Sequence, residues 1–142
     1  MCILAPVTKH PLRPRSQDPG EDGADPVRPS RELITGERPL RILFVCTANI
    51  CRSPAAEHLA RYRFGEAGAV FRSAGFLTED EACPEFLLRA LGELGVDAKE
   101  HRSYRLDPAS LEAADLVLTM EGQHVPSATR LQRGAFPKIV PL

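Results

Sequence analysis

The pattern of apolar and polar residues from Leu40 onward alternates between short apolar runs and amphipathic segments. The runs at residues 40–45, 70–74 and 116–120 are rich in branched or aromatic residues and predict three strands. A shorter fourth strand is expected at residues 136–140. Because amphipathic segments separate these runs, the pattern predicts an α/β fold, with a parallel sheet and helices on both of its faces.

The intervening segments carry the spacing and the end signals of helices. The first predicted helix runs from about Pro54 to Phe64, and its apolar face consists of Ala56, Leu59, Ala60 and Phe64. The second begins at Pro84 and ends near Gly95, and its expected buried stripe consists of Leu87, Leu88, Leu91 and Leu94. A short third helix is expected over residues 108–113, with Asp107 as its N-cap.

Residues 1–39 differ in composition from the rest of the chain. They contain seven of the thirteen prolines, mixed with charged residues and glycine, and they show neither a helical nor a strand period. Such a segment buries too little apolar surface to offset the entropy lost on ordering. We therefore expect residues 1–39 to be a disordered extension, either a solvated tail or a docking tail, and residues 40–142 to form one domain.

Composition narrows the classes of function. A formal net charge of −1 does not favour binding to nucleic acid or to an anionic membrane, and no apolar run is long enough to span a bilayer. The four cysteines are not spaced as a disulfide framework, and Cys46 with Cys51 would supply only half of a zinc site. We expect a cytoplasmic protein that uses no metal and no cofactor.

The most distinctive stretch is Cys-Thr-Ala-Asn-Ile-Cys-Arg-Ser-Pro, from Cys46 to Pro54. It joins a predicted strand to a predicted helix, for which Ser53 is the expected N-cap, and such a junction favours an anion through its unpaired amides and the helix dipole. Arg52 adds a planar fork for two phosphate oxygens, and the same positive field favours the thiolate form of Cys46. The alternative is a buried structural cysteine, but a packed core does not require the accompanying arginine and hydroxyl.

The segment Cys46–Glu57 resembles the signature of the low-molecular-weight protein tyrosine phosphatases. The similarity continues through Ser-Ala-Gly at 73–75, His-Arg-Ser at 101–103 and Ala-Asp-Leu-Val-Leu-Thr-Met at 114–120. It implies a three-layer α/β sandwich with a four-stranded parallel sheet, here lacking the family's C-terminal helix. It also implies hydrolysis of phosphotyrosine-type phosphate monoesters, on a protein or a small molecule, through a phosphocysteine intermediate.

The resemblance also assigns roles to individual residues. Cys46 corresponds to the nucleophile, Arg52 to the phosphate clamp, and Ser53 to a hydroxyl that donates to the sulfur. Substrate oxygens are expected at the loop residues Thr47, Ala48, Asn49, Ile50 and Cys51. Asn49, Ser73 and His101 resemble the residues that brace the loop. Cys51 either forms a protective disulfide with Cys46 or packs as a small residue, and Glu121 is either a partner of Arg52 or a solvated glutamate.

Two departures from the family pattern keep other functions open. Ala48 stands where glycine is more common, which requires a negative φ at that residue. The family's general acid, an aspartate followed by proline, has no counterpart after the fourth predicted strand, and Asp107-Pro108 is expected to begin a helix instead. A non-catalytic phosphate-binding or phosphotyrosine-binding module is therefore an alternative. An arsenate reductase is a weaker one, because no cysteine follows Cys83.

Overall fold

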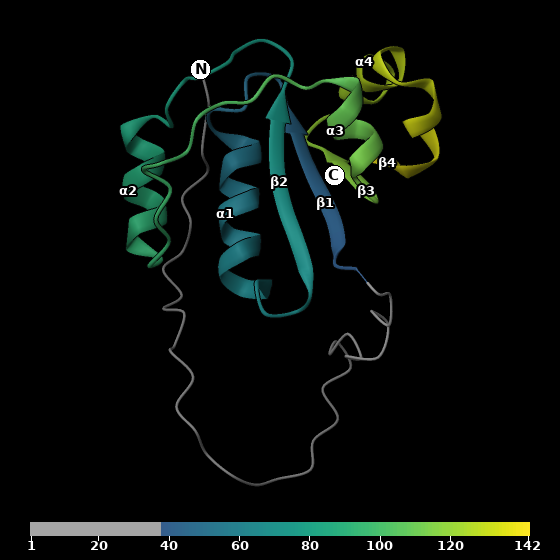
Figure 1. Ribbon diagram of the computed structural model, residues 1–142. Helices are drawn as coiled ribbons and strands as arrows, with labels where there is room; N and C mark the ends of the chain where they lie inside the picture. The colour runs from purple at the N-terminus through teal and green to yellow at the C-terminus, as the bar shows by residue number, and fades with distance from the viewer. Residues whose placement is uncertain (1–37) are drawn as a thin grey trace, which may run out of the picture.

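The computed structural model describes residues 38–142, so most of the predicted N-terminal extension, residues 1–37, lies outside the described residues. Four strands form one parallel sheet in the order β2-β1-β3-β4 (Figure 1). The elements in chain order are β1 (Leu40–Cys46), α1 (Arg52–Phe64), β2 (Ala69–Gly75), α2 (Glu85–Glu93), α3 (Pro108–Ala113), β3 (Leu116–Thr119), α4 (His124–Leu131), the 3₁₀ helix η1 (Arg133–Lys138) and β4 (Ile139–Pro141). The predicted α/β class and the four-stranded parallel sheet are confirmed.

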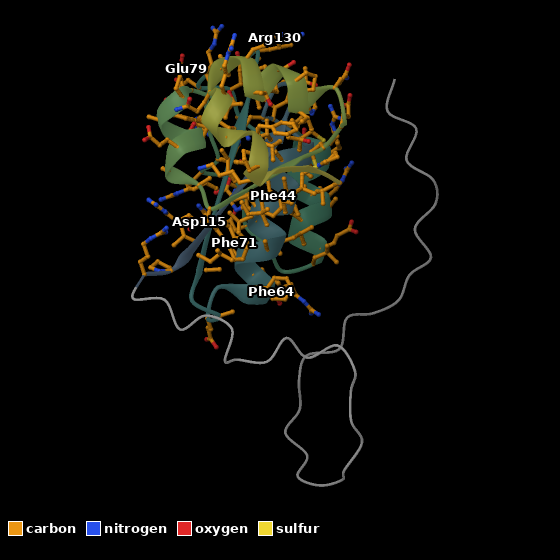
Figure 2. The ribbon with its side chains drawn as sticks, turned by 90° about the vertical axis from the view of Figure 1, so that its right-hand side faces the viewer. Phe44, Phe64, Phe71, Glu79, Asp115 and Arg130 are labelled. Carbon is orange, nitrogen blue, oxygen red and sulfur yellow. The ribbon has the colours of Figure 1, made fainter. Side chains whose placement is uncertain are left out.

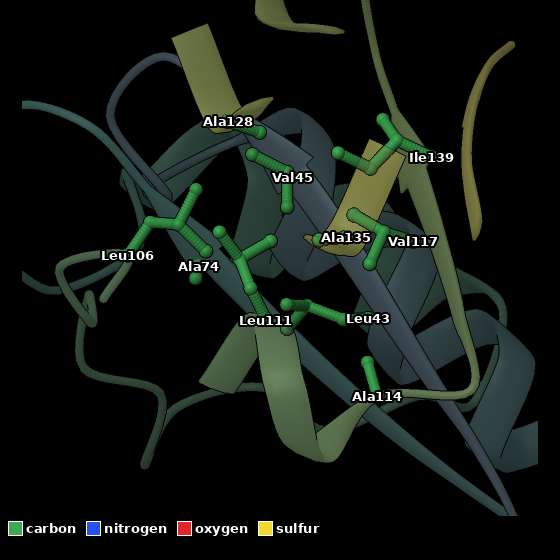
Figure 3. Close-up of a cluster of buried hydrophobic side chains, with 10 residues drawn as sticks. All are labelled: Leu43, Val45, Ala74, Leu106, Leu111, Ala114, Val117, Ala128, Ala135 and Ile139. Atoms are coloured by element: carbon green, nitrogen blue, oxygen red, sulfur yellow. The ribbon is translucent and has the colours of Figure 1, made fainter. Parts of the chain in front are cut away.

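Helices lie on both faces of the sheet (Figure 1). One face packs against α3, α4 and η1 through a buried apolar cluster, shown in Figure 3, that consists of Leu43, Val45, Ala74, Leu106, Leu111, Ala114, Val117, Ala128, Ala135 and Ile139. On the other face, Phe44 and Phe71 stack with their ring centroids 6.4 Å apart (Figure 2), and α1 packs against β1 and β2. Burial of these side chains supplies the main stabilising free energy of the layers.

Helix α1 differs from its prediction at both its start and its buried face. It begins at Arg52 after the N-cap residue Cys51, so the expectation that Ser53 is the N-cap is wrong. The buried positions are Ser53, Pro54 and Glu57, and Phe64 is 54% exposed at the far end of the helix (Figure 2). Of the predicted apolar face, Leu59 packs against the apolar cluster under α2 and Phe64 is exposed. The side of α1 that faces the sheet instead carries polar groups that bond to the adjacent loop and strand.

Helices α2 and α3 follow their end signals. Leu87 and Leu91 of α2 are buried as expected, but Leu94 is exposed, because it stands at the C-cap where the chain leaves the helix. Gly95 follows with a φ of 76°, a conformation that glycine adopts without strain. Asp107 caps α3, and its side chain accepts a hydrogen bond from the Ser110 amide at 2.7 Å.

The C-terminal elements depart most from the sequence pattern. The fourth strand spans Ile139–Pro141 rather than residues 136–140, because residues 133–138 wind into η1. Helix α4 was not predicted at all. It contains Pro126 and is only 8 residues long, so its apolar positions Val125, Ala128 and Leu131 span too short a stretch to mark a helix in the sequence.

The first described residues are tied to the sheet. Arg38 donates two hydrogen bonds to the Asp115 carboxylate, at 2.7 and 2.8 Å, and the Arg41 amide donates to the same group at 2.8 Å. The Arg38 guanidinium holds the pKa of Asp115 well below its usual range. Contacts with the domain therefore begin before Leu40, the residue at which the sequence predicted the domain to start.

Candidate active site

The loop from Cys46 to Arg52 joins the carboxyl end of β1 to the start of α1. Cys46 is 3% exposed, and its Sγ accepts a hydrogen bond from the backbone amide of Asn49 at 3.2 Å. The Ser53 hydroxyl lies 3.0 Å from the same sulfur. Both contacts suit a negatively charged sulfur, because each can place a donor hydrogen against it.

Asn49 is the central brace of the loop. It is completely buried and has a φ of 55°, in the left-handed region that asparagine tolerates better than most residues. Its Nδ2 donates to the hydroxyls of Ser53 and Ser73, at 2.9 and 2.8 Å, and its Oδ1 accepts from the Tyr104 amide at 2.7 Å. Its carbonyl oxygen lies 2.8 Å from His101 Nε2. Asn49, Ser73 and His101 are thus brought together.

A buried carboxylate extends this hydrogen-bonded series. Glu57 is 5% exposed, accepts a hydrogen bond from the Ser73 hydroxyl, and forms an ion pair with Arg61 at 2.5 Å. Hydrogen bonds therefore connect Glu57 through Ser73, Asn49 and Ser53 to the sulfur of Cys46. The sequence analysis did not assign Glu57 a role; its position four residues after Ser53 on one helical face was the available signal.

The end of β2 supports the loop backbone. A Cβ atom on Gly75 would lie 2.6 Å from the Asn49 amide nitrogen, so this glycine is what allows strand and loop to approach. The Phe76 and Leu77 amides both donate to the Thr47 carbonyl, at 2.7 and 3.1 Å. The sequence analysis required a negative φ at Ala48, and Ala48 is not among the described residues with positive φ.

Arg52, at the end of the loop, is held on both terminal nitrogens. Its Nη1 bonds the Glu121 carboxylate, and its Nη2 donates to Thr47 Oγ1 at 3.2 Å. The hydrogen bond from Arg52 lowers the pKa of Glu121 most, and the hydrogen bond from Gln123 lowers it further. Arg52 keeps 45% of its side chain exposed, which leaves it accessible to a ligand. Of the two alternatives for Glu121, the structure shows the partner of Arg52.

His124, at the start of α4, reaches the same loop. It is 4% exposed, its Nε2 lies 3.1 Å from Thr47 Oγ1, and its ring stacks on Phe76 with the centroids 5.5 Å apart. Burial lowers the pKa of this histidine. The sequence analysis missed His124, because a single histidine four residues after a predicted strand carries no motif.

The cysteines of the described residues differ in environment. Cys46, Cys51 and Cys83 are all thiols rather than disulfides. Cys83 lies in the small apolar cluster under α2, where burial raises its pKa to about 11.

Residues 38–142 contain no group of three or more His, Cys, Asp or Glu side chains placed to hold a metal ion. The same residues include no helix with the length and apolar character of a membrane span.

Asp107 is the only aspartate after Cys46 that is followed by proline. Its carboxylate caps α3. The Tyr104 hydroxyl donates to its carboxylate, and this bond together with those from Ser110 lowers its pKa. A general acid must hold a proton at the working pH. The position of Asp107 and its lowered pKa therefore fit a helix cap and not a general acid.

A cavity of about 770 Å³ lies beside β2. Its lining includes the bracing residues Ser73 and His101 but no residue from Cys46 to Arg52. It is therefore a separate feature from the phosphate loop.

Comparison with known proteins gives a consistent family. A family model described as low molecular weight phosphotyrosine protein phosphatase matches residues 41–140. A probable low molecular weight protein-tyrosine-phosphatase, EpsP of Ralstonia nicotianae, is 36% identical over 81 residues, which cover 57% of this chain and 55% of the relative. An arsenate reductase of Bacillus licheniformis is 40% identical over 81 residues, covering 57% and 56%.

Solved structures agree with this result. The YwlE arginine phosphatase from Geobacillus stearothermophilus superposes with a TM-score of 0.68 at 35% identity, over 72% of this chain and 66% of that one. The chain spans about half the length of the curated relatives it matches. The matched region contains the whole loop from Cys46 to Arg52 and the strand ends that surround it.

Proposed function

The chain belongs to the family of low molecular weight phosphotyrosine protein phosphatases, and from this premise we propose that it hydrolyses phosphotyrosine-type phosphate monoesters, with Cys46 as the nucleophile and Arg52 as the phosphate clamp. The substrate is a phosphotyrosine-containing protein or a small aryl phosphate. The reaction passes through a phosphocysteine intermediate.

One observation carries this proposal. Two hydrogen-bonding groups, the Asn49 amide and the Ser53 hydroxyl, lie 3.2 and 3.0 Å from the Cys46 sulfur at the start of a loop that ends on an arginine fork. A structural cysteine in a core needs neither group. A sulfur that must carry negative charge, both before attack and on leaving, needs both.

The first step transfers the phosphoryl group to the enzyme. The Cys46 thiolate attacks phosphorus in line with the leaving oxygen, so a P–S bond forms as the P–O bond to the phenol breaks. The loop amides and Arg52 hold the three equatorial oxygens, whose charge must be stabilised throughout the transfer. The phenol oxygen departs and takes up a proton.

The second step regenerates the enzyme. Water attacks phosphorus, a new P–O bond forms, and the P–S bond breaks to release inorganic phosphate and the Cys46 thiolate. The Ser53 hydroxyl, 3.0 Å from Sγ, donates to the sulfur as its charge returns. Asn49 keeps that hydroxyl in place through the bond from its Nδ2, because it also anchors to Ser73 on β2.

Proton donation to the leaving group requires a side chain that holds a proton at the working pH. Among residues 38–142, Glu121 is bound to Arg52 and Asp107 caps α3, and the pKa of each is lowered. Neither carboxyl is suited to hold a proton near neutral pH. This is the observation that favours the second candidate function, a module that binds phosphotyrosine without turning it over. A buried thiol with the Asn49 backbone amide and the Ser53 hydroxyl within hydrogen-bond distance favours the enzyme.

The proposal is tested by turnover and binding measured on the same preparations. Cys46→Ser should abolish hydrolysis of aryl phosphates while phosphate still binds, and Arg52→Lys should weaken both, because an ammonium cannot replace a bidentate fork. Cys83→Ser is the matched control, since it changes a buried thiol outside the loop and should keep turnover. Turnover that survives Cys46→Ser would overturn the mechanism.

A substrate panel separates the related activities. Phosphotyrosine peptide, phosphoarginine peptide and arsenate with a thiol reductant are offered to the same enzyme. We expect hydrolysis of the tyrosine and aryl phosphates. Preference for phosphoarginine, or arsenate reduction, would instead place the chain with the arginine phosphatase or the arsenate reductase to which it is similar. Phosphate binding without turnover of any of these would favour the binding module.

A further inference from the structure

The turn between β3 and α4 supports Arg52 at two points. Glu121 in this turn bonds Nη1 directly. His124, which follows it, reaches Nη2 through the Thr47 hydroxyl, with 3.1 Å from Nε2 to Oγ1 and 3.2 Å from Oγ1 to Nη2. The guanidinium is thus held between a carboxylate and a hydroxyl, and the hydroxyl is in turn held by a histidine.

The guanidinium fixes the direction of one of these bonds. Because a guanidinium only donates, Thr47 Oγ1 accepts from Arg52. The direction of the other bond depends on the tautomer of His124. With the ring proton on Nδ1, Nε2 accepts the hydroxyl proton of Thr47, and with the ring proton on Nε2, it donates to the same oxygen.

His124 is the fixed end of this chain of contacts. Its ring is buried and stacked on Phe76, and its backbone amide donates to the Glu121 carbonyl at 3.0 Å. Its Nδ1 is buried and has no hydrogen-bond partner among the described residues. An apolar ring would fill the same space without leaving a buried polar atom unpaired. The histidine differs from such an apolar ring in its hydrogen bond with Thr47.

The charge of the imidazole matters because of its neighbours. The charged groups that face it are Glu121, from its own turn, and Arg52, from the start of α1; Thr47 and Phe76 are neutral. Protonation would place a second cation beside Arg52, and in the ring that carries its proton on Nδ1 it would convert Nε2 from an acceptor into a donor. Thr47 would then face two donors, and its own proton would lose its acceptor.

We propose that His124 is a positioning residue: its neutral imidazole, with the ring proton on Nδ1, orients the Thr47 hydroxyl, which holds the Arg52 guanidinium in place for phosphate binding. This inference rests on the proposed function, because it concerns how the same loop binds phosphate. It adds a residue that acts through Thr47 and touches no substrate atom itself. It also makes phosphate affinity sensitive to acid through a group outside the loop.

The test is calorimetric titration of the full chain with inorganic phosphate, which requires no turnover. His124→Phe keeps an aromatic ring against Phe76 but removes the acceptor, and it should weaken phosphate binding about tenfold, the effect of roughly one lost hydrogen bond to the clamp. His124→Gln places an amide oxygen near the position of Nε2 and should recover most of that loss. Thr129→Val, which removes a hydroxyl bonded within α4, is the control and should not change the affinity.

The pH profile separates positioning from packing. As pH falls through the range in which His124 takes up a proton, the wild type should lose phosphate affinity relative to His124→Gln, which cannot titrate. The titration of phosphate itself is common to both proteins and cancels in the ratio. A wild type and a His124→Gln variant with parallel profiles would overturn the proposal.

A double-mutant cycle provides the second test. Because His124 acts through Thr47, the double variant Thr47→Val/His124→Phe should bind phosphate no more weakly than Thr47→Val alone. Additive losses would overturn the proposal. If His124→Phe does not fold, the pH profiles of His124→Gln and Thr47→Val still test the proposal. Circular dichroism checks that these two variants fold. A His124→Phe variant that binds phosphate like an active wild type overturns this inference alone, whereas a wild type that binds no phosphate overturns the proposed function with it.

Discussion

The side-chain amide of Asn49 donates to the Ser73 hydroxyl over 2.8 Å and so ties the phosphate loop to the second strand. The same nitrogen bonds Ser53 at 2.9 Å, and the Ser53 hydroxyl lies 3.0 Å from the Cys46 sulfur. The position of the hydroxyl beside the Cys46 sulfur is therefore set from β2. The geometry of the sulfur depends on residues 24 positions apart in the chain.

Asn49→Ala should destabilise the protein by about 4 kcal/mol and Asn49→Gly by about 3 kcal/mol. The alanine variant loses three side-chain hydrogen bonds, each worth about 1 kcal/mol net, and places alanine in a left-handed conformation. Asn49→Gly is the control, because glycine removes the hydrogen bonds but accepts the positive φ. Urea denaturation measures both. Equal stability of Asn49→Ala and the wild type would show that these bonds do not brace the loop.

Gly75→Ala should reduce phosphate affinity by more than tenfold in a protein that still folds. The new Cβ would lie 2.6 Å from the Asn49 amide nitrogen and 2.8 Å from the Ala48 carbonyl carbon, so the loop backbone must move. A displacement of this kind costs binding because the amides must meet the phosphate oxygens within hydrogen-bond distance. Titration with phosphate measures the loss.

Gly92→Ala is the matched control for that substitution. Gly92 lies in α2, and a Cβ there would meet no atom within 4 Å. Alanine in a helix interior is favoured over glycine by about 0.5–1 kcal/mol. We expect Gly92→Ala to bind phosphate like the wild type and to melt at the same or a higher temperature. If both alanine variants bind equally well, the close approach at Gly75 does not shape the loop.

Asp107→Ala should lower stability by about 1 kcal/mol, the usual effect of losing an N-cap, and leave turnover of aryl phosphates unchanged. Since the pKa of Asp107 is lowered in the folded state, its stabilising effect is present above the ordinary carboxyl pKa and is lost as pH falls through the folded-state value. Asp107→Ser, which keeps a capping side chain, should restore most of the stability. Loss of turnover in both variants would mean that Asp107 acts as an acid.

The dependence of rate on the leaving group tests the proton donor. A tyrosine leaving group has a pKa of about 10 and needs a proton as it departs, and general acid catalysis contributes about a hundred- to ten-thousand-fold. Because Glu121 and Asp107 are committed elsewhere, we expect the 142-residue chain to be slow on phosphotyrosine peptides and much faster on phosphates of acidic phenols. A plot of log rate against leaving-group pKa should slope steeply downward. A flat plot would show that a proton donor operates within these residues.

The parts of the structure that the sequence predicted are those with strong local signals. The apolar run before Cys46, the Asp-Pro start of α3 and the glycine after α2 each specify backbone conformation within a few residues. Ser73 and Glu121, both named in the sequence analysis, reach the loop from Cys46 to Arg52 because parallel strands end at one edge of the sheet.

The parts that it missed depend on contacts between distant residues. The inner face of α1 could not be predicted from apolar spacing, because Ser53 and Glu57 are buried there for their hydrogen bonds. Helix α4 is too short for its apolar spacing to mark it, and the contact of His124 Nε2 with Thr47 Oγ1, at 3.1 Å, joins residues 77 positions apart. Polar groups that shape a site follow no hydrophobic pattern.

The central claim is that Cys46 attacks phosphorus, and rapid-quench trapping tests it most directly. An aryl phosphate with an acidic phenol is mixed with the enzyme and quenched within the first turnover, and the protein is digested and mapped by mass spectrometry. The account predicts one phosphoryl group on the peptide that contains Cys46, at the sulfur, and none in Cys46→Ala. Phenol release in that first turnover with no phosphoryl group on Cys46, or with the group on another residue, would contradict it.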